Sequence, residues 1–170
     1  LPSGRSPMAV RDGCRDWRGQ ERLEEELRAI KGMGIGLDLL LNANCWGGRS
    51  LSRQLANLVR SIVAHLREDV GLDVVTTASL MVARTVKEHF PGLEVRASVN
   101  MRIGTVEAME YVADYFDSFH IQREQNRDLA RVRELAGWAA ERGKKVSILA
   151  NSGCLACCPG QTFHDNLVAH

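Results

Sequence analysis

Several common signatures are missing from this chain of 170 residues, and each absence argues against a class of protein. No stretch approaches the run of about eighteen apolar residues that indicates a membrane-spanning helix, and no basic segment leads into an apolar one as in a secretory signal. We therefore expect a cytoplasmic protein with reduced thiols and no membrane partner. The formal charge is +1 and acids and bases are interleaved, so the totals show no excess of positive charge for binding nucleic acid.

The motifs of familiar hydrolases and dinucleotide-binding enzymes are missing too. The sequence has no Gly-x-Ser-x-Gly elbow, no His-Glu-x-x-His pair and no recognisable Ser, His and Asp spacing. Gly32, Gly34 and Gly36 precede a predicted strand, whereas the glycines of a dinucleotide fingerprint follow a strand and open a helix. Hydrolysis by the usual routes is therefore not indicated by any local motif.

The composition and the residue pattern of the chain are those of one globular domain. Hydrophobic residues make up 45% of the 170 residues, which is enough to form a buried core. Residues 1–20 are rich in Arg, Gly and Pro with little apolar period, and we interpret them as an irregular opening, either a loop or a cut edge. Residues 21–170 are predicted to form the domain.

Apolar periodicity predicts strands that alternate with helices. Strands are expected over 37–42, 72–77, 93–99, 116–121 and 145–150, the last as a buried strand. Helices are expected over 22–31, 51–66 with Ser50 as N-cap, 79–90, 105–115 and 127–142, with a sixth starting near the end of the chain. This alternation predicts a parallel α/β fold, although periodicity does not separate an open doubly wound sheet from part of an eight-stranded barrel.

Every predicted strand ends in polar side chains. The carboxyl ends of parallel strands meet at one edge of a sheet, where ligands bind in α/β proteins. Strand ends run into loops, so polarity there is also common by chance. Amides recur among them, however, and amides recognise polar ligands without carrying charge. We predict that substrate is bound by Asn42, Asn100, Gln122, Asn151 and His164.

Three of the five cysteines lie in the last twenty residues. Cys154 and Cys158 are close enough in sequence for two thiolates to share a metal, and Pro159 follows as in iron-sulfur sites. A zinc ion or a four-iron cluster needs four ligands, and Cys45, at the end of another strand, is a candidate. Two other readings stay open. In one, the cysteines are simply small buried residues without a chemical role. In the other, Cys154 and Cys157 form a redox pair, a reading that the adjacent Cys158 disfavours.

The histidines give a weaker signal. His120 falls inside an apolar strand, which favours a core histidine with satisfied hydrogen bonds over a catalytic one. His65 and His89 fall in or at the end of helices and are predicted to be surface residues. His164 and His170 are six residues apart, so they do not share one helix face as a metal-binding pair does.

The sequence resembles the collagenase-like U32 peptidase family over about residues 3–170. The resemblance is carried by a terminal motif, Asn151-x-Gly153-Cys154-Leu155-x-x-Cys158-Pro159, followed by Phe163-His164-x-Asn166-Leu167 and His170, and by the segments 40–45 and 126–128. The chain departs from the family pattern at Cys157, where an Asn is usual, and at 160–161, where Gly and Gln replace Phe and Arg.

The resemblance implies a TIM-like barrel, of which this chain would form an incomplete part, completed by further strands or a partner subunit. Some family members are described as peptidases of unassigned catalytic type, and others bind an iron-sulfur cluster and support hydroxylation of ubiquinone precursors or RNA bases. Carried over by position, Cys154 and Cys158 would be cluster ligands and Cys45 a third. We expect cluster-dependent modification of a small-molecule, peptide or RNA substrate, with zinc as the other metal; the alternatives are a peptidase or an inactive scaffold.

Overall fold

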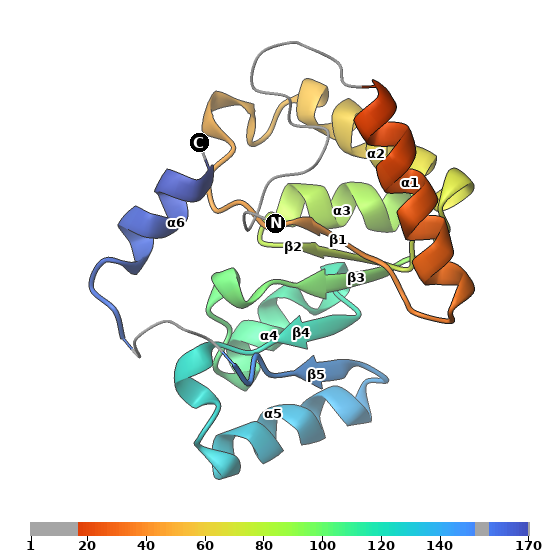
Figure 1. Cartoon of the computed structure of the whole chain (residues 1–170). Coiled ribbons are helices and arrows are strands. Elements are labelled where there is room, and N and C mark those ends of the chain that lie inside the picture. Colours follow the sequence, from red (N-terminus) through yellow and green to blue (C-terminus); the bar gives the residue numbers. More distant parts are fainter. Residues whose placement is uncertain (1–16, 152–156, 170) are drawn as a thin grey trace.

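The computed structural model describes residues 17–151 and 157–169, which form a parallel sheet flanked by helices (Figure 1). The strands are β1 (Asp38–Leu41), β2 (Val74–Thr77), β3 (Glu94–Ala97), β4 (Ser118–His120) and β5 (Lys145–Ser147). The helices are α1 (Trp17–Gly32), α2 (Arg53–Asp69), α3 (Leu80–His89), α4 (Val106–Val112), α5 (Leu129–Glu141) and α6 (Gln161–Ala169). Short 3-10 helices are η1 (Gly47–Arg49), η2 (Val99–Met101), η3 (Ala113–Tyr115) and η4 (Arg123–Gln125).

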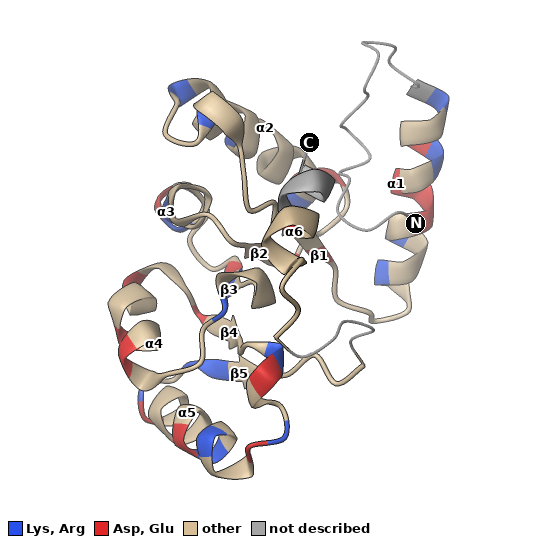
Figure 2. Ribbon diagram, turned by 90° about the vertical axis from the view of Figure 1, so that its left-hand side faces the viewer, with Lys and Arg blue, Asp and Glu red and all other residues tan. Residues whose placement is uncertain are grey.

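The order of the strands resolves the choice between the two α/β architectures. Within the described part of the chain the sheet has the order β1-β2-β3-β4-β5, and every pair is parallel. Figure 2 shows α2, α3, α4 and α5 along the outside of the curved sheet. A doubly wound sheet carries its helices on both faces, whereas a barrel carries them all outside. The predicted incomplete TIM-like α/β fold is therefore confirmed.

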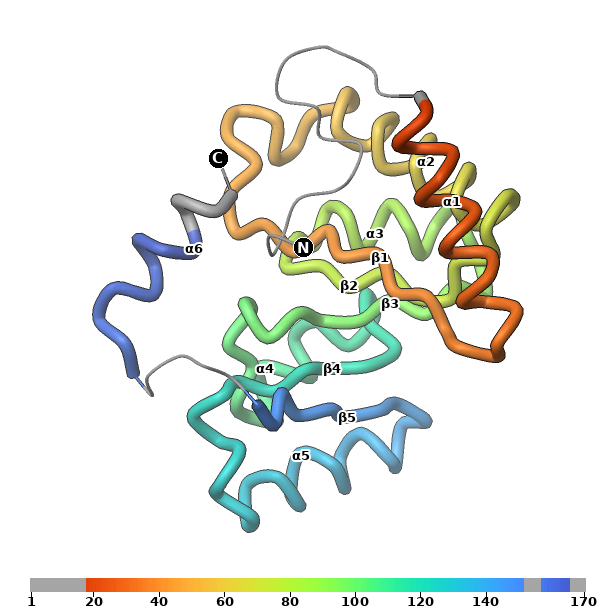
Figure 3. Tube along the Cα trace, in the orientation of Figure 1, coloured from red at the N-terminus to blue at the C-terminus, as the bar shows by residue number. Residues whose placement is uncertain are grey.

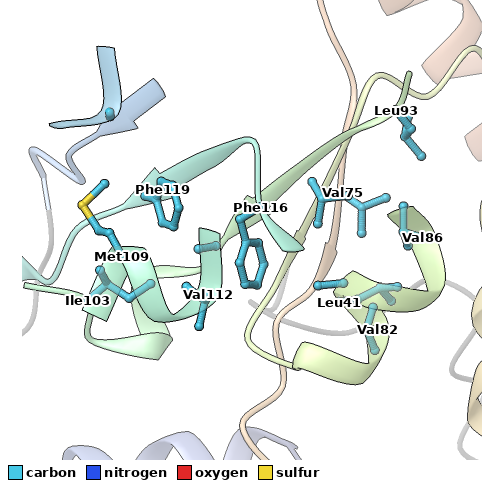
Figure 4. Close-up of a cluster of buried hydrophobic side chains, with 14 of the residues drawn as sticks. Leu41, Val75, Val82, Val86, Leu93, Ile103, Met109, Val112, Phe116 and Phe119 are labelled. Atoms are coloured by element: carbon cyan, nitrogen blue, oxygen red, sulfur yellow. The ribbon is translucent and has the colours of Figure 1, made fainter. Parts of the chain in front are cut away.

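The core lies between the sheet and these helices. Side chains alternate between the two faces of a strand, so Val75, Val95 and Phe119 point to the same, helix-covered face. Each of the three is fully buried, and their neighbours include Val82 and Met109 from the helices (Figure 4). We call this helix-covered side the outer face and the opposite side the inner face.

Side-chain caps set where the helices begin. Ser79 caps α3, as predicted. The predicted N-cap of α2 was wrong: Ser52, not Ser50, accepts the hydrogen bond of the Leu55 N–H, at 3.1 Å. Ser50 instead follows the end of η1, and its hydroxyl donates to the carbonyl of Gly47, the first residue of η1. Apolar periodicity did not reveal this one-turn helix. A short 3-10 turn therefore delays α2 by two residues.

The fifth strand differs from its prediction in burial. β5 spans only Lys145–Ser147, and Ile148 and Leu149 beyond it are 44% and 39% exposed. β5 pairs with β4 on one side and has no strand partner on the other among the described residues. An edge strand buries less than a central one, so this apolar run, predicted to be buried, is largely exposed.

Helix α1 contacts the end of α2 rather than the sheet core. The His65 Nε2 and the Glu24 Oε1 lie 2.8 Å apart, and the Arg28 guanidinium donates to the Asp69 carbonyl at 2.8 Å. The predicted apolar face of α1, made of Leu23, Leu27 and Ile30, is partly buried. In the part of the chain that the structure describes, none of the helices has the length and apolar character needed to cross a bilayer.

Candidate functional site

Loops from different strands meet at the carboxyl edge of the sheet. The Asn100 side-chain amide, in η2 after β3, donates to the Asn42 carbonyl, after β1, at 3.1 Å. Both residues are half-buried. Residues 58 positions apart in the sequence therefore share one part of this edge, as the polar strand ends suggested. That both belong to a substrate site stays a prediction.

A second contact at this edge brings the loops after β3 and β4 together. The Gln122 N–H donates to the Ile103 carbonyl at 2.7 Å. Next to it, a Cβ on Gly104 would lie 2.5 Å from the Gln122 Nε2, so the Gln122 side chain covers this glycine. A larger residue at position 104 would displace the Gln122 side chain, so the glycine lets the Gln122 amide lie over this loop.

Helix α6 lies beyond the carboxyl ends of the strands, away from the outer face (Figures 1 and 3). Its Asp165 is only 8% exposed. The Asn44 side-chain amide donates to the Asp165 Oδ2 at 3.1 Å, and the Arg102 Nη2 lies 3.9 Å from the same oxygen and 3.4 Å from the Thr162 hydroxyl. Arg102 has a left-handed backbone, with φ of 54°. A non-glycine residue there is strained by about 1 kcal/mol, and such strain gathers at functional sites.

The inner face carries charged side chains in place of aliphatic ones. Arg96 of β3 is at the centre: its Nη1 contacts the Asp38 Oδ2 at 3.0 Å, its Nη2 the Glu94 Oε1 at 2.8 Å, and its Nε the Ser118 hydroxyl at 3.1 Å. Lys145 of β5 donates to the other oxygen of Glu94 at 2.8 Å. Thr76 of β2 donates to the Asp38 Oδ2 at 2.8 Å, so all five strands contribute to one network of ion pairs and hydrogen bonds, which we call the inner-face network.

This network controls the protonation of Glu94. Burial alone would raise the pKa of the Glu94 carboxyl, but hydrogen bonds from Lys145, Ser118 and Arg96 outweigh burial and lower that pKa to about 2. The carboxylate therefore stays ionised at any physiological pH. It holds Arg96 and Lys145 in place on the inner face.

His120 lies on the same face, one step nearer the carboxyl edge. Because Phe119 points into the core, its neighbour His120 points to the inner face. The His120 Nδ1 is buried, and no described residue forms a hydrogen bond with it. Burial, with the positive charge of Arg96 nearby, lowers the pKa of the ring, so the imidazole is neutral near pH 7. The prediction of a core histidine with satisfied hydrogen bonds is therefore wrong: side chains alternate along β4, so Phe119 enters the core while His120 lies on the inner face, where its Nδ1 has no partner among the described residues.

The predicted metal ligands are only partly described. Cys154 lies outside the described residues. Cys45 is half-buried in the loop after β1, where its sulfur accepts the Gly47 N–H at 3.3 Å. Cys158 is half-buried just before α6, next to the exposed Cys157, whose backbone N–H donates to Glu124 at 3.4 Å. Within 17–151 and 157–169, no three His, Cys, Asp or Glu side chains form a group that could hold a metal.

The other two predicted substrate-binding residues lie at the surface. Asn151 is exposed at the end of the segment after β5, and His164 is exposed on the first turn of α6. His65 was predicted to be a surface residue, yet it bridges Glu24 and Asp69 while remaining 35% exposed. His89 is exposed, as predicted.

The sequence analysis did not identify Arg102 and Asp165, the two charged residues that link the loops of the carboxyl edge to α6. Arg102 follows the polar end of β3 by only two residues beyond Asn100, so the polar strand-end pattern could have included it. Asp165 had no comparable signal, because its burial depends on a loop 121 residues earlier in the chain that folds against α6. The inner-face network was hidden by short strands whose charged residues resembled ordinary exposed positions.

One curated protein and one solved structure are similar to this chain. The sequence is 23% identical over 151 residues to the uncharacterized protease MJ1657 of Methanocaldococcus jannaschii, a match that covers 88% of this chain and 44% of that protein. The fold matches the solved structure of the U32 peptidase Mk0906 with a TM-score of 0.72 and 20% identity, over 88% of this chain and 59% of that chain. The resemblance to the U32 peptidases is confirmed. No protein-family model matches the sequence.

The likeness covers only part of each relative. The chain spans less than half of the M. jannaschii protease and about three fifths of Mk0906. At this level of identity the structural match establishes the U32 peptidase fold. The activity of the whole protein is a separate question, for which the residues of the inner face and the carboxyl edge provide the arguments.

Proposed function

We propose that this chain is part of a U32-type barrel protein that binds a peptide across the inner face and carboxyl edge of its sheet, where His120 acts as the base in peptide hydrolysis. The observation that carries this proposal is the buried Nδ1 of His120, which has no hydrogen-bond partner among the described residues. Buried polar atoms are almost always hydrogen-bonded, and an exception needs an explanation. A bound ligand is the explanation that also accounts for the inner face being polar.

The neutral ring of His120 suits this role. Its lowered pKa leaves the Nδ1 able to accept a proton near pH 7. In the proposed step, the Nδ1 takes a proton from a water molecule, the oxygen of that water bonds to the peptide carbonyl carbon, and the carbon-nitrogen bond breaks. The same proton then passes to the leaving amine, so water is the only co-reactant. A peptide substrate is also consistent with the names of both relatives, one a protease and one a peptidase.

A pH profile with a His120→Asn variant tests the proposal. Cleavage of fluorescein-labelled casein by the whole chain should rise with pH through a midpoint below about 6.5, because the base must be neutral and its pKa is lowered. His120→Asn should lose about 100-fold or more of the rate. His89→Asn, an exposed histidine on α3, is the matched control and should behave as the unmodified chain. Equal rates in the His120 and His89 variants would overturn the proposal.

A second candidate is an iron-sulfur protein that modifies a small molecule or RNA, for example by hydroxylation. It is favoured by the Gly47 N–H that points at the Cys45 sulfur, because hydrogen bonds to sulfur tune iron-sulfur clusters. The described cysteines alone do not provide a complete set of ligands, so the cluster, or a zinc ion, would depend on Cys154 as well as Cys45 and Cys158. A cytoplasmic location would keep these thiols reduced.

Anaerobic purification followed by iron and sulfide assays tests this candidate. A cluster would give both elements in equal amounts and a visible absorbance band, and Cys45→Ala or Cys158→Ala would lower them. Cys157→Ala serves as the comparison, since Cys157 is exposed and has a left-handed backbone, with φ of 53°. Iron-free protein from anaerobic cells, or iron retained by all three variants, would contradict the cluster.

We also propose that further strands, from a longer polypeptide or a partner subunit, pair with the edges of β1 and β5 that have no strand partner among the described residues. Apolar residues exposed beside these edges support this: Leu40 on β1 is 48% exposed, and Ile148 follows β5. A barrel closes only when both edges are paired. Sedimentation of the chain at increasing concentration tests the subunit version, which predicts a dimer that Ile148→Glu weakens. A monomer at all concentrations would contradict it.

A further inference from the structure

One carboxylate of this chain already lies against polar side chains at the carboxyl edge. Asp165 of α6 is 8% exposed, and its Oδ2 accepts the Asn44 amide at 3.1 Å and faces the Arg102 guanidinium at 3.9 Å. Asn44 comes from the loop after β1 and Arg102 from the loop after β3. Two strand ends of the candidate site therefore converge on a single carboxylate that reaches them from a separate helix.

The described part of α6 is attached by polar contacts. Of residues 161–165, whose side chains the structure describes, none belongs to the apolar core, and Phe163 is 73% exposed. Besides Asp165, the Thr162 hydroxyl accepts from Arg102 at 3.4 Å, and just before the helix the Cys157 N–H donates to Glu124. Each of these polar contacts contributes only about 1 kcal/mol net, so a competing carboxylate can replace the contacts that hold residues 161–165.

We propose that Asn44 and Arg102 form a carboxylate-binding subsite, and that Asp165 occupies this subsite when no ligand is bound. The inference rests on the proposed peptide-binding function and specifies its substrate: the ligand is the carboxylate at the C-terminus of a peptide or on an acidic side chain. Asp165 acts as an internal substitute for that group. A peptide carboxylate displaces it and moves α6 away from the edge.

The chemistry of the two residues fits a carboxylate. A guanidinium and a primary amide both donate through planar N–H groups, both lie nearest the same oxygen of Asp165, and the one positive charge of Arg102 balances the single charge of a carboxylate. A phosphate monoester carries nearly two negative charges, of which one guanidinium neutralises only one. Arg102 ends η2 in a left-handed backbone conformation, with φ of 54°, so its side chain lies at the carboxyl edge directly after β3.

Occupation by Asp165 must weaken the binding of an external carboxylate. A ligand that binds only when the subsite is open has its affinity reduced by the fraction of molecules that are open. Removing the charge of Asp165 should therefore strengthen binding of a carboxylate, and only of a carboxylate. A purely structural anchor predicts the opposite, because its loss would loosen the edge and gain nothing.

The test uses the whole chain and two versions of one peptide, acetyl-tetra-alanine with a free carboxylate and the same peptide with a C-terminal amide. Binding is measured by titration with detection of the backbone amide signals of Asn44 and Arg102 by NMR. Asp165→Asn should bind the free-carboxylate peptide about tenfold more tightly than the unmodified chain, equivalent to a competing contact of about 1.4 kcal/mol. The amide peptide should gain nothing.

Two further variants keep this test interpretable. Asp165→Asn with Arg102→Gln should lose the gain, because the guanidinium is gone. Asp114→Asn, an exposed residue of η3, makes the same change of charge elsewhere and should leave both affinities unchanged. Circular dichroism of each variant checks that it is folded, and asparagine at position 165 can still accept from Asn44.

The possible outcomes separate the subsite from the proposed function. Equal gains for both peptides, or no gain, would overturn the carboxylate subsite and leave peptide binding in place. If neither peptide binds but acetate shifts the Asn44 and Arg102 signals more strongly in Asp165→Asn, the subsite stands and the peptide function fails. If neither acetate nor the peptides shift these signals in any variant, the subsite is wrong.

Discussion

The two faces of the sheet differ as strongly as any two regions of this molecule. On the outer face, Val75, Val95 and Phe119 are fully buried beneath helices. On the inner face the same strands present Arg96 and Glu94 joined by ion pairs and hydrogen bonds, with His120 beside them. Adjacent residues of one strand, such as Phe119 and His120, therefore belong to different chemical environments. The outer face provides stability, and the inner face provides the groups that can bind or react.

The difference follows from what covers each face. Helices α2 to α5 exclude water from the outer face, so apolar side chains there contribute the full energy of burial, about 25 cal/mol per Å². Within the described residues nothing comparable covers the inner face. Charged groups remain there because they satisfy one another, as in the three contacts of the Arg96 guanidinium. Substitutions on the two faces should therefore have different energetic and pH-dependent signatures.

The largest effect is expected on the outer face. Phe119→Ala removes a fully buried ring that packs against Phe116 and Trp138, with ring centroids 6.2 and 6.1 Å away. The free energy of unfolding should fall by about 3–5 kcal/mol, independently of pH between 5 and 8. Urea unfolding measures it. Phe163→Ala, at an exposed phenylalanine of α6, should change it by less than about 0.5 kcal/mol. Similar losses for the two variants would mean that the core is not where the structure places it.

A smaller but pH-dependent effect is expected on the inner face. The folded pKa of Glu94 is depressed to about 2, so its stabilising contribution is complete above its unfolded pKa of 4.5 and is lost as pH falls from there toward 2. Glu94→Gln should therefore lower the free energy of unfolding by about 2 kcal/mol at pH 7, and by progressively less below pH 4.5.

The control for the Glu94→Gln variant is the same substitution at Glu88, another glutamate in an ion pair. Glu88→Gln removes an exposed pair with Arg84 on α3 and should change stability by less than about 1 kcal/mol. Unfolding curves at pH 7, 4 and 3 provide the comparison. A loss for Glu94→Gln that stays the same at all three pH values would show that the inner-face network does not depend on the charge of Glu94.

The smallest effect on stability is expected at the contact between α1 and α2, which lies on neither face of the sheet. Hydrogen bonding to Glu24 raises the folded pKa of His65, so the contribution of His65 is complete below its unfolded pKa of 6.5 and is lost as pH rises through the raised folded value. His65 also lowers the pKa of Glu24, whose contribution is lost below 4.5. The contact should be strongest between these values. The backbone amides of α1 should thus be better protected from hydrogen exchange at pH 6 than at pH 8, after correction for the intrinsic pH dependence of exchange. In His65→Gln the protection should be the same at both pH values.

Much of the fold could be predicted from the sequence because its signals are local. Apolar runs of strand length, helical periodicity and caps such as Ser79 are read from residues close together in the chain. Four helix N-termini are capped in this way, by Ser52, Ser79, Thr105 and Asp128. The misplaced cap at Ser50 shows the limit of the method, since two serines two residues apart compete and a 3-10 turn decides between them.

The site could be predicted only in outline. The polar ends of the strands predicted that the loops at the carboxyl edge come together, and the contact between Asn42 and Asn100 lies there; that a substrate binds at this edge stays a prediction. The orientation of His120 could not be obtained in this way, because a strand of three residues is too short for alternation to show which face is covered. The exposure of Ile148 was missed for a similar reason: the apolar character of a strand does not reveal whether it lies at the edge.

By itself, then, the sequence determined the alternating α/β architecture, the U32 resemblance and the edge at which polar groups collect, because each depends on spacing along the chain. Only the tertiary structure decided that Arg96 joins residues from several strands, that His120 points away from the core, and that Asp165 lies between Asn44 and Arg102. These features depend on which distant segments become neighbours. Distances in space between segments 22 to 121 residues apart are set by the packing of the whole sheet, and no local pattern encodes them.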